Sequence, residues 1–207
     1  MAAIYNMMGE MYIRSTPENS SPYYKKAIKT INDKESAYHF QFLFNLGKST
    51  LYSGRAQESL VYSTELVELA EIQNSASLPH FYFLKAFAYI ELNDFEKALD
   101  ISNKVIQILH PGCELDLIEH INLETFDPPS HKAVNINLLS RMGLEFVNGF
   151  PNNEEALSAA NAIFQLGIME YGKAITSTKM THYTKTMYEQ LVWGIINSQQ
   201  YLKEGDL

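Results

Sequence analysis

The stretch LKAFAYIELNDFEKAL, residues 84–99, joins an aromatic-rich apolar run, a short polar break and a second amphipathic run. The break, Asn93-Asp94, is typical of a helix end, because the end of a helix is commonly closed by glycine or asparagine. The stretch therefore predicts two helices joined by a tight turn. Both an isolated helical hairpin and one unit of a repeat would fit it, so the decisive question is whether the pattern recurs.

The pattern recurs twice upstream, at intervals of 38 and 39 residues. In each copy a small residue, Gly9, Gly47 or Ala86, sits inside an apolar run, and the last two are followed 12 residues later by Ser59 and Ala98. Antiparallel helices approach closely only where the contact lacks bulk, so we expect these small residues at helix crossings. The chain is therefore predicted to be an array of helical hairpins.

Turns and helix faces agree with this prediction. Ser53-Gly54 matches Asn93-Asp94 as a helix-ending turn, and Pro79 stands near the start of a helix, where proline is tolerated. The second helices carry core-type residues at helical spacing. These residues are Leu60, Ser63, Leu66, Val67 and Ala70, and then Leu99, Ser102, Val105, Ile106 and Leu109.

We expect one helical-repeat domain over residues 1–207. Its parts are units at about 3–38, 39–77 and 78–111, an irregular insertion at 112–130, a degenerate fourth unit at 131–175 with Gly143 in the small position, and a closing helix at 181–203. The closing helix has the polar residues that the cap of an array needs. The helical pattern begins almost at Met1, and we expect a further domain to precede this segment.

This arrangement resembles the tetratricopeptide repeat superfamily. The residues that carry the resemblance are Met8-Gly9 with Tyr12 and Ala27, Leu46-Gly47 with Ser59, and Tyr82, Ala86, Tyr89, Phe95, Ala98 and Pro111. The period exceeds the usual 34 residues, and Lys85 replaces an expected apolar residue. The resemblance implies an all-α fold, a right-handed superhelix of antiparallel helix pairs (an α-solenoid), in which the first helix of each unit lines a concave groove.

Carried over position by position, the resemblance also implies the groove residues. For peptide contact we expect Asn6, Arg14, Gln41, Phe44, Asn45, Lys48, Tyr52, Phe83, Phe87, Asn137 and Arg141, with Glu10, His80, Glu91, Leu144 and Asn148 beside them. Amide side chains can donate to and accept from a peptide backbone, and aromatic rings can form apolar pockets. Phe44, Phe83 and Phe87 would equally fit a role in packing between neighbouring units.

Two functions remain open within this superfamily. The long repeats, tyrosine-rich helices and asparagine-lined groove resemble the sensor domains of Rap- and PlcR-type regulators and of arbitrium-type phage receptors. The resemblance implies a quorum-sensing type of transcription regulator that binds a short signalling peptide, which is our prediction. The alternative is a scaffold or adaptor for protein–protein interaction. Adaptors of this superfamily that bind an acidic C-terminal tail use Lys, Arg and Asn side chains; here that set is only partial, and the charges of Glu10 and Glu91 would repel such a tail.

Charge and composition exclude other partners. The net charge of −8 argues against direct nucleic-acid contact by this segment, and no apolar run approaches the roughly 20 residues that cross a membrane. A single cysteine, Cys113, fits a reducing compartment, so we expect a cytoplasmic protein. Trp193 and Tyr188 on the last helix suggest a possible homodimer.

Catalytic signatures are weak, so we predict a protein that is not an enzyme and needs no cofactor or metal. FNLGKST lacks the spacing of a phosphate-binding loop. His110, Cys113 and His120, with Glu119, lack the second close pair of a zinc site. A hydrolase or metal enzyme using residues 110–131 is the third possibility.

Overall fold

A computed structural model describes residues 1–31, 33–111, 133–177, 186 and 189–198. Every regular element in these residues is a helix, which confirms the all-α prediction. The helices are α1 (Ala2–Tyr12), α2 (Pro17–Lys29), α3 (Ala37–Tyr52), α4 (Ala56–Ile72), α5 (Leu78–Glu91), α6 (Phe95–Leu109), α7 (Ala133–Gly149) and α8 (Glu154–Ser177). Residues 189–198 are also helical.

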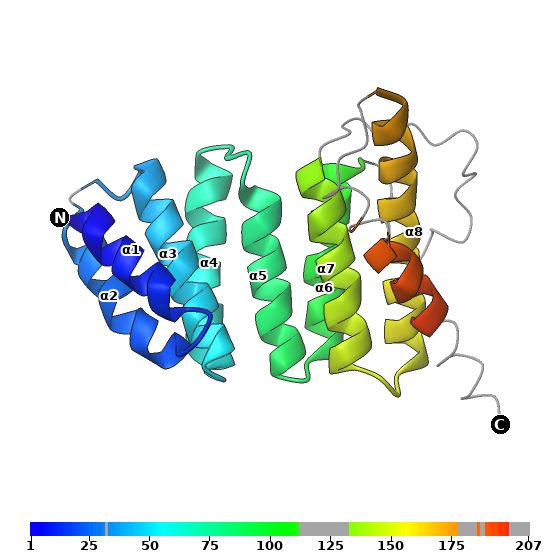
Figure 1. Cartoon of the computed structure of the whole chain (residues 1–207), viewed down its shortest axis with the longest axis horizontal. Helices are drawn as coiled ribbons and strands as arrows, with labels where there is room; N and C mark the ends of the chain where they lie inside the picture. The colour runs from blue at the N-terminus through cyan, green and yellow to red at the C-terminus, as the bar shows by residue number, and fades with distance from the viewer. Residues whose placement is uncertain (32, 112–132, 178–185, 187–188, 199–207) are drawn as a thin grey trace. The chain divides into compact units, whose positions relative to one another are not determined.

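The chain forms two compact units, Met1–Asp94 and Phe95–Leu207. In the N-terminal unit each helix from α1 to α5 packs against the next, and α3 also contacts α5 (Figure 1). Side chains hydrogen-bond α1 to α3 and α2 to α4, so α1, α3 and α5 form one layer and α2 and α4 the other. This sequential packing of helix pairs is consistent with a tetratricopeptide-like α-solenoid.

The repeat boundaries and the single domain over 1–207 stay predictions. The insertion at 112–130 lies outside the described residues, and of the closing helix at 181–203 the structure describes only 186 and 189–198.

The predicted small residues lie at close helix contacts. A Cβ atom on Gly9 would come within 2.5 Å of the Tyr24 ring on α2, and one on Gly47 within 2.8 Å of Leu84 Cδ2 on α5. The first contact closes a hairpin, whereas the second joins the first helices of successive hairpins. The prediction that small residues mark helix crossings is thus confirmed at both glycines.

Three consecutive helices, α3, α4 and α5, end in the same way. Each is followed by a residue of positive φ, namely Gly54 (71°), Asn74 (51°) and Asn93 (56°). The next N–H then donates to the carbonyl five residues back at 2.9 Å, in the pairs Arg55–Thr50, Ser75–Ala70 and Asp94–Tyr89. This is the Schellman closure, and it confirms the turns predicted at Ser53-Gly54 and Asn93-Asp94.

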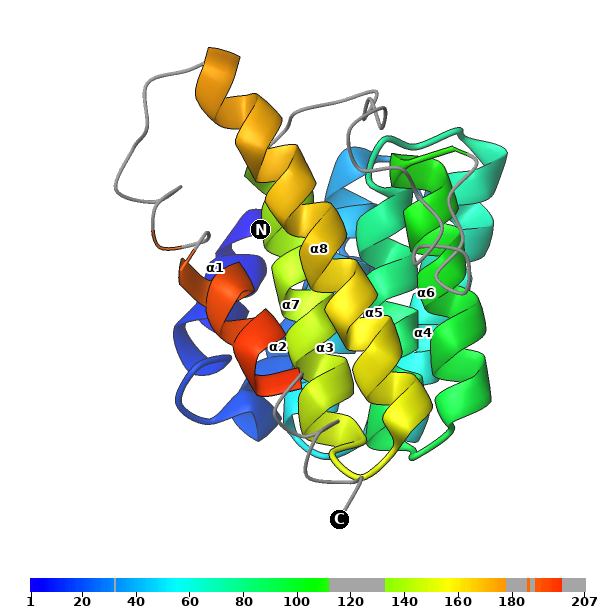
Figure 2. The same ribbon diagram turned by 90° about the vertical axis from the view of Figure 1, so that its right-hand side faces the viewer.

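In the C-terminal unit α7 and α8 pack along each other, and α8 also contacts α6 (Figure 2). Cβ atoms on Gly143 and Gly194 would both come within 2.5 Å of the buried Phe164 ring. A Cβ on Gly167 would come within 2.6 Å of Leu191. The helical residues 189–198 therefore pack against α8, and Gly143 is a close-contact position, as predicted.

Candidate functional site

One side of α3 carries five of the eleven predicted binding residues, namely Gln41, Phe44, Asn45, Lys48 and Tyr52. Each of these side chains has another member of the set three or four residues away, so they share one face, and all are at least partly exposed. Because α3 contacts α5 and is hydrogen-bonded to α1, this side runs along the middle of its layer. We call the surface the first-helix face and define it as Asn6, Glu10, Gln41, Phe44, Asn45, Lys48 and Tyr52.

Three polar side chains of this face connect α1 to α3. Asn45 Nδ2 donates to Asn6 Oδ1 at 3.0 Å and to Glu10 Oε1 at 3.4 Å. Asn6, which is buried, donates to the same Glu10 oxygen at 2.8 Å. The N–H groups of the Asn45 amide are therefore hydrogen-bonded within the protein. The oxygens Asn45 Oδ1 and Glu10 Oε2 can accept hydrogen bonds from a ligand.

Lys48 lies one turn further along α3, between two aromatic rings. Its Nζ is 5.7 Å from the Phe44 ring centroid and 5.9 Å from the Tyr52 ring centroid, which is cation–π distance. Lys48 lies three residues after Asn45 on the same face of α3, so this face carries an ammonium donor as well as the two acceptors. A peptide backbone offers both N–H and C=O groups, so a row that holds acceptors and a donor can pair with both.

Beside this row, α3, α5 and the turns before them line an open pocket of about 500 Å³, which we call the α3/α5 pocket. Phe40 and Phe81 stack in it with ring centroids 5.8 Å apart and planes 2° from parallel. Phe44 tilts against Phe81 at 5.7 Å. The other lining residues are Glu35, Ala37, Gln41, Gln73, Ser75, Ser77 and His80.

The remaining predicted residues of the N-terminal unit lie apart from this row. Arg14 is exposed in the turn after α1, and Glu91 is exposed at the end of α5. Phe83 and Phe87 are buried and stack on each other at 6.2 Å, so little of either ring is accessible to a ligand.

Asn137 and Arg141, with Leu144 and Asn148, lie on α7 in the C-terminal unit. Asn137 and Arg141 are both half-buried. Their membership of one groove with α3 stays a prediction.

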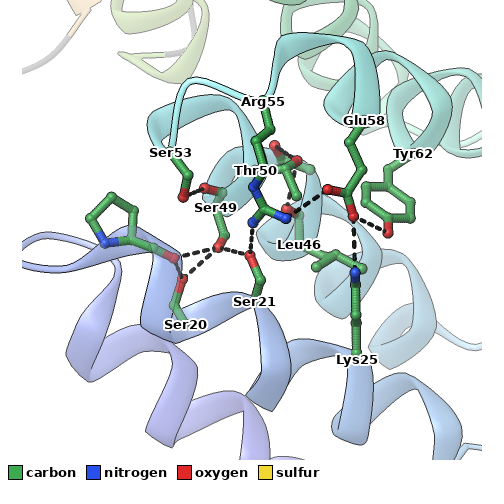
Figure 3. Close-up of polar contacts among 12 residues, drawn as sticks. Ser20, Ser21, Lys25, Leu46, Ser49, Thr50, Ser53, Arg55, Glu58 and Tyr62 are labelled. Carbon is green, nitrogen blue, oxygen red and sulfur yellow. Dashed lines mark hydrogen bonds and ion pairs between the residues drawn. The ribbon is translucent and has the colours of Figure 1, made fainter.

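Sequence reasoning missed a polar cluster that ties α2 to α3 and α4 (Figure 3). Ser49 Oγ lies 2.5 Å from Ser20 Oγ and 2.6 Å from Ser21 Oγ, and it donates to the Pro17 carbonyl at 2.9 Å. Arg55 Nη2 donates to Ser21 Oγ at 2.8 Å. All three serines are buried, so the cluster holds helices together and is not a surface for ligands.

The cluster continues outward to a carboxylate that shifts the pKa of its neighbours. Glu58 accepts from Lys25 at 2.9 Å, Arg55 at 2.6 Å and Tyr62 at 2.8 Å. The Lys25 hydrogen bond is the main reason that the pKa of Glu58 is lowered, and the same bond raises the pKa of Lys25. Burial, followed by the hydrogen bond to Glu58, raises the pKa of Tyr62.

The possible metal group is only partly described. Cys113, Glu119 and His120 lie outside the described residues, and among those described no three His, Cys, Asp or Glu side chains are grouped for a metal ion. His110 instead lies in the core, with Nε2 at 3.1 Å from Glu170 Oε1 and both side chains fully buried. Asn135 donates to the same Glu170 oxygen at 3.5 Å.

Surface features at the end of the chain and along the helices complete the description. Trp193 is exposed, whereas Tyr188 lies outside the described residues, so the homodimer stays a prediction. In the part of the chain that the structure describes, no helix combines the length and apolarity needed to cross a membrane.

The fold and the site together define an array of helical hairpins with a polar and aromatic face on its first helices. Comparison with protein families gives one further finding: residues 79–108, which cover most of α5 and α6, match the tetratricopeptide repeat family. Repeats of this family typically serve as non-catalytic modules for protein–protein interaction. No curated protein and no solved structure matches the chain.

Proposed function

We propose that this chain binds a short peptide on its first-helix face and serves as the sensor of a quorum-sensing type regulator, with control of transcription as its output. The observation that carries the proposal is the row of Asn45, Glu10 and Lys48, where oxygen acceptors and an ammonium donor lie beside aromatic rings. Such a row suits the alternating N–H and C=O groups of an extended peptide. A cytoplasmic location belongs to the same proposal.

The acceptors of this row are held in place before any ligand arrives. Asn45 is fixed by two hydrogen bonds and Glu10 by the buried Asn6. A binding group that is already ordered loses less conformational entropy when the ligand binds. The row therefore favours a specific ligand over general stickiness.

A peptide-display selection against the full chain tests the proposal. The selected peptides are then measured against wild type, Lys48→Ala and Asn45→Ala, with Glu68→Ala as control, since Glu68 is exposed on α4 in the other layer. We expect a loss of about tenfold in affinity for Lys48→Ala and for Asn45→Ala, because each removes a hydrogen bond to the peptide of about 1.4 kcal/mol. Glu68→Ala should bind as wild type does.

Lys48→Ala is the sharper variant, because Asn45 also supports Asn6 inside the protein. Peptides that bind all four proteins equally would place the ligand elsewhere and contradict the proposal. A selection that yields no peptide would also contradict it.

A second candidate is a scaffold that binds a folded protein. It is favoured by the apolar side chains of Ile4, Met7 and Met11, which lie on one side of α1 with 56 %, 64 % and 77 % of their surface exposed. Methionine adapts to varied partners, and exposed apolar patches mark interaction sites. A failed peptide selection combined with a protein partner whose binding is lost in Met7→Glu would support this candidate.

A further inference from the structure

The α3/α5 pocket carries a single formal charge. Among its lining residues, with histidine counted as neutral, only Glu35 carries a formal charge, and no lysine or arginine lines it. Within the described part of the chain the Glu35 carboxylate makes no ion pair, although its backbone N–H is fixed by Asp33 Oδ1 at 2.9 Å. The pocket therefore has one carboxylate without an ion pair, and the nearby ammonium of Lys48, which does not line the pocket, lies 5.7 Å from the Phe44 ring centroid.

The polar rim consists of amide and hydroxyl side chains, which offer acceptors beside Glu35. Gln73 donates through Nε2 to the Glu35 carbonyl at 3.5 Å, which leaves Gln73 Oε1 to accept from a ligand. Gln41 is exposed on the same rim. Together with the Glu35 carboxylate, the rim can accept several hydrogen bonds from a ligand.

The helix end at the pocket offers few donors to an anion. Pro79 has no N–H, and the amides of Leu78, His80 and Phe81 already donate to the carbonyls of the preceding turn at 3.0 to 3.3 Å. The N-terminus of α5 therefore does not turn the pocket into an anion site, which leaves the Glu35 charge to select the ligand.

The floor is aromatic. Phe40 and Phe81 are nearly buried as a parallel stack, and Phe44, which is half-buried, leans over Phe81. A planar cation binds to an aromatic face and, when it is a guanidinium, still presents five N–H donors to surrounding oxygens. An ammonium has only three donors and no planar surface to stack.

We propose that the α3/α5 pocket is a subsite for an arginine side chain of the bound peptide, with the guanidinium over the aromatic floor and paired with Glu35. This inference rests on the proposed function, because Phe44 belongs both to the pocket and to the first-helix face. Binding to the row of Asn45, Glu10 and Lys48 does not require any particular side chain, whereas this subsite requires that the ligand carry an arginine.

The test uses four blocked tripeptides as probes, Ac-Gly-X-Gly-NH2, where X is arginine, citrulline, lysine or phenylalanine. Citrulline has nearly the shape of arginine without its charge. Binding to the full chain is followed by ¹H–¹⁵N chemical-shift changes at Gln41, Gln73 and Phe81. We expect saturable shifts with the arginine peptide and a loss of about fivefold to tenfold in affinity with citrulline, because the charged hydrogen bonds are lost.

Protein variants give the matched control. Glu35→Gln should lower the affinity for the arginine peptide to that for the citrulline peptide, whereas Glu68→Gln, which removes an equal charge from α4, should leave it unchanged. Equal binding of arginine and citrulline, tighter binding of phenylalanine, or no shift at the pocket would each overturn the arginine subsite. If display-selected peptides still lost affinity in Lys48→Ala, the first-helix face would bind a peptide without this subsite. The arginine subsite and the proposed function can therefore fail separately.

Discussion

His39 is a buried histidine in α3 whose two ring nitrogens have no hydrogen-bond partner in the described part of the chain. Burial is the main reason that its pKa is lowered; Glu65, the next largest influence, raises it, Lys34 lowers it, and Asp33 raises it by the smallest amount. The folded state therefore holds His39 neutral at pH values where the unfolded chain already binds a proton. Unfolding then takes up a proton, so acid favours the unfolded chain.

We predict that His39→Leu flattens the pH dependence of stability. In wild type, the stability that depends on neutral His39 should be fully present above the ordinary histidine pKa of about 6.5. It should be lost as the pH falls from there toward the lowered pKa of the folded state. Chemical denaturation of both proteins at several pH values between neutral and mildly acidic measures the two slopes. Equal slopes would show that His39 titrates alike in both states.

At the scale of helices, close contact depends on the glycines that the sequence pattern identified. Tyr24 is fully buried, and its ring would lie 2.5 Å from a Cβ atom on Gly9. We predict that Gly9→Ala lowers the free energy of unfolding by about 1–3 kcal/mol through overpacking. Urea denaturation of the full chain measures this change.

Gly172 on α8 provides the control for this prediction. It is exposed, and an added Cβ would meet no atom within 4 Å. Gly172→Ala should therefore be neutral or stabilise the protein by up to about 1 kcal/mol, because alanine favours helix. A Gly9→Ala protein as stable as wild type would mean that α1 and α2 can separate at no cost.

The polar cluster between α2, α3 and α4 allows a second prediction at this scale. Ser49→Ala should cost about 1–3 kcal/mol, because it removes the buried hydroxyl that is hydrogen-bonded to Ser20, Ser21 and the Pro17 carbonyl. Glu58→Gln should cost less than about 1 kcal/mol at neutral pH, because Lys25 and Arg55 are partly exposed and screened by water. Thermal unfolding of both variants measures which substitution lowers stability more. A larger loss of stability for Glu58→Gln than for Ser49→Ala would contradict this prediction.

The ionisation of Glu58 sets the pH range in which its side chain stabilises the folded protein. Its pKa is lowered in the folded state, so its stabilising effect is present above the ordinary glutamate pKa and is lost as the pH falls through the lowered value. Glu58→Gln should therefore differ from wild type near neutral pH and converge with it in strong acid.

Helix order, several turns and the small residues at Gly9, Gly47 and Gly143 were predictable, because each rests on a local pattern. The Asn74-Ser75 turn was not, since only its backbone conformation sets it apart from other polar stretches. The stack of Phe40 on Phe81 could not be predicted for another reason. The spacing of a phenylalanine predicts that it faces the core but does not predict which helix it packs against.

Part of the candidate site was predictable for the same reason. The row on α3 followed from helical spacing, whereas the direction of each amide did not. The two bonds that Asn45 donates depend on how α1 lies against α3, which is a tertiary property.

At the scale of the whole molecule, each of the two compact units has its own core. In the C-terminal unit the buried ring of Phe164 receives close contacts from both Gly143 and Gly194, so this one side chain connects α7, α8 and residues 189–198. In helical arrays stability is a sum of local terms and contacts between neighbours.

We predict that Phe164→Ala, at a local cost of about 3–5 kcal/mol, speeds amide hydrogen exchange in α7 and α8 but leaves α1 to α4 protected as in wild type. Hydrogen exchange read by mass spectrometry on the full chain resolves the two regions. Equal acceleration across all helices would show that the chain unfolds as one cooperative block.

The shared closure of α3, α4 and α5 has a consequence for how such a chain changes over evolutionary time. Gly54 and Asn93 end two helices with the same backbone turn, 39 positions apart, which equals one interval of the repeat. A gene duplication or deletion with breakpoints at two such turns would add or remove a whole helix pair and leave every remaining helix end closed. Arrays with such interchangeable junctions can lengthen or shorten without passing through a form whose helix ends lack their hydrogen bonds.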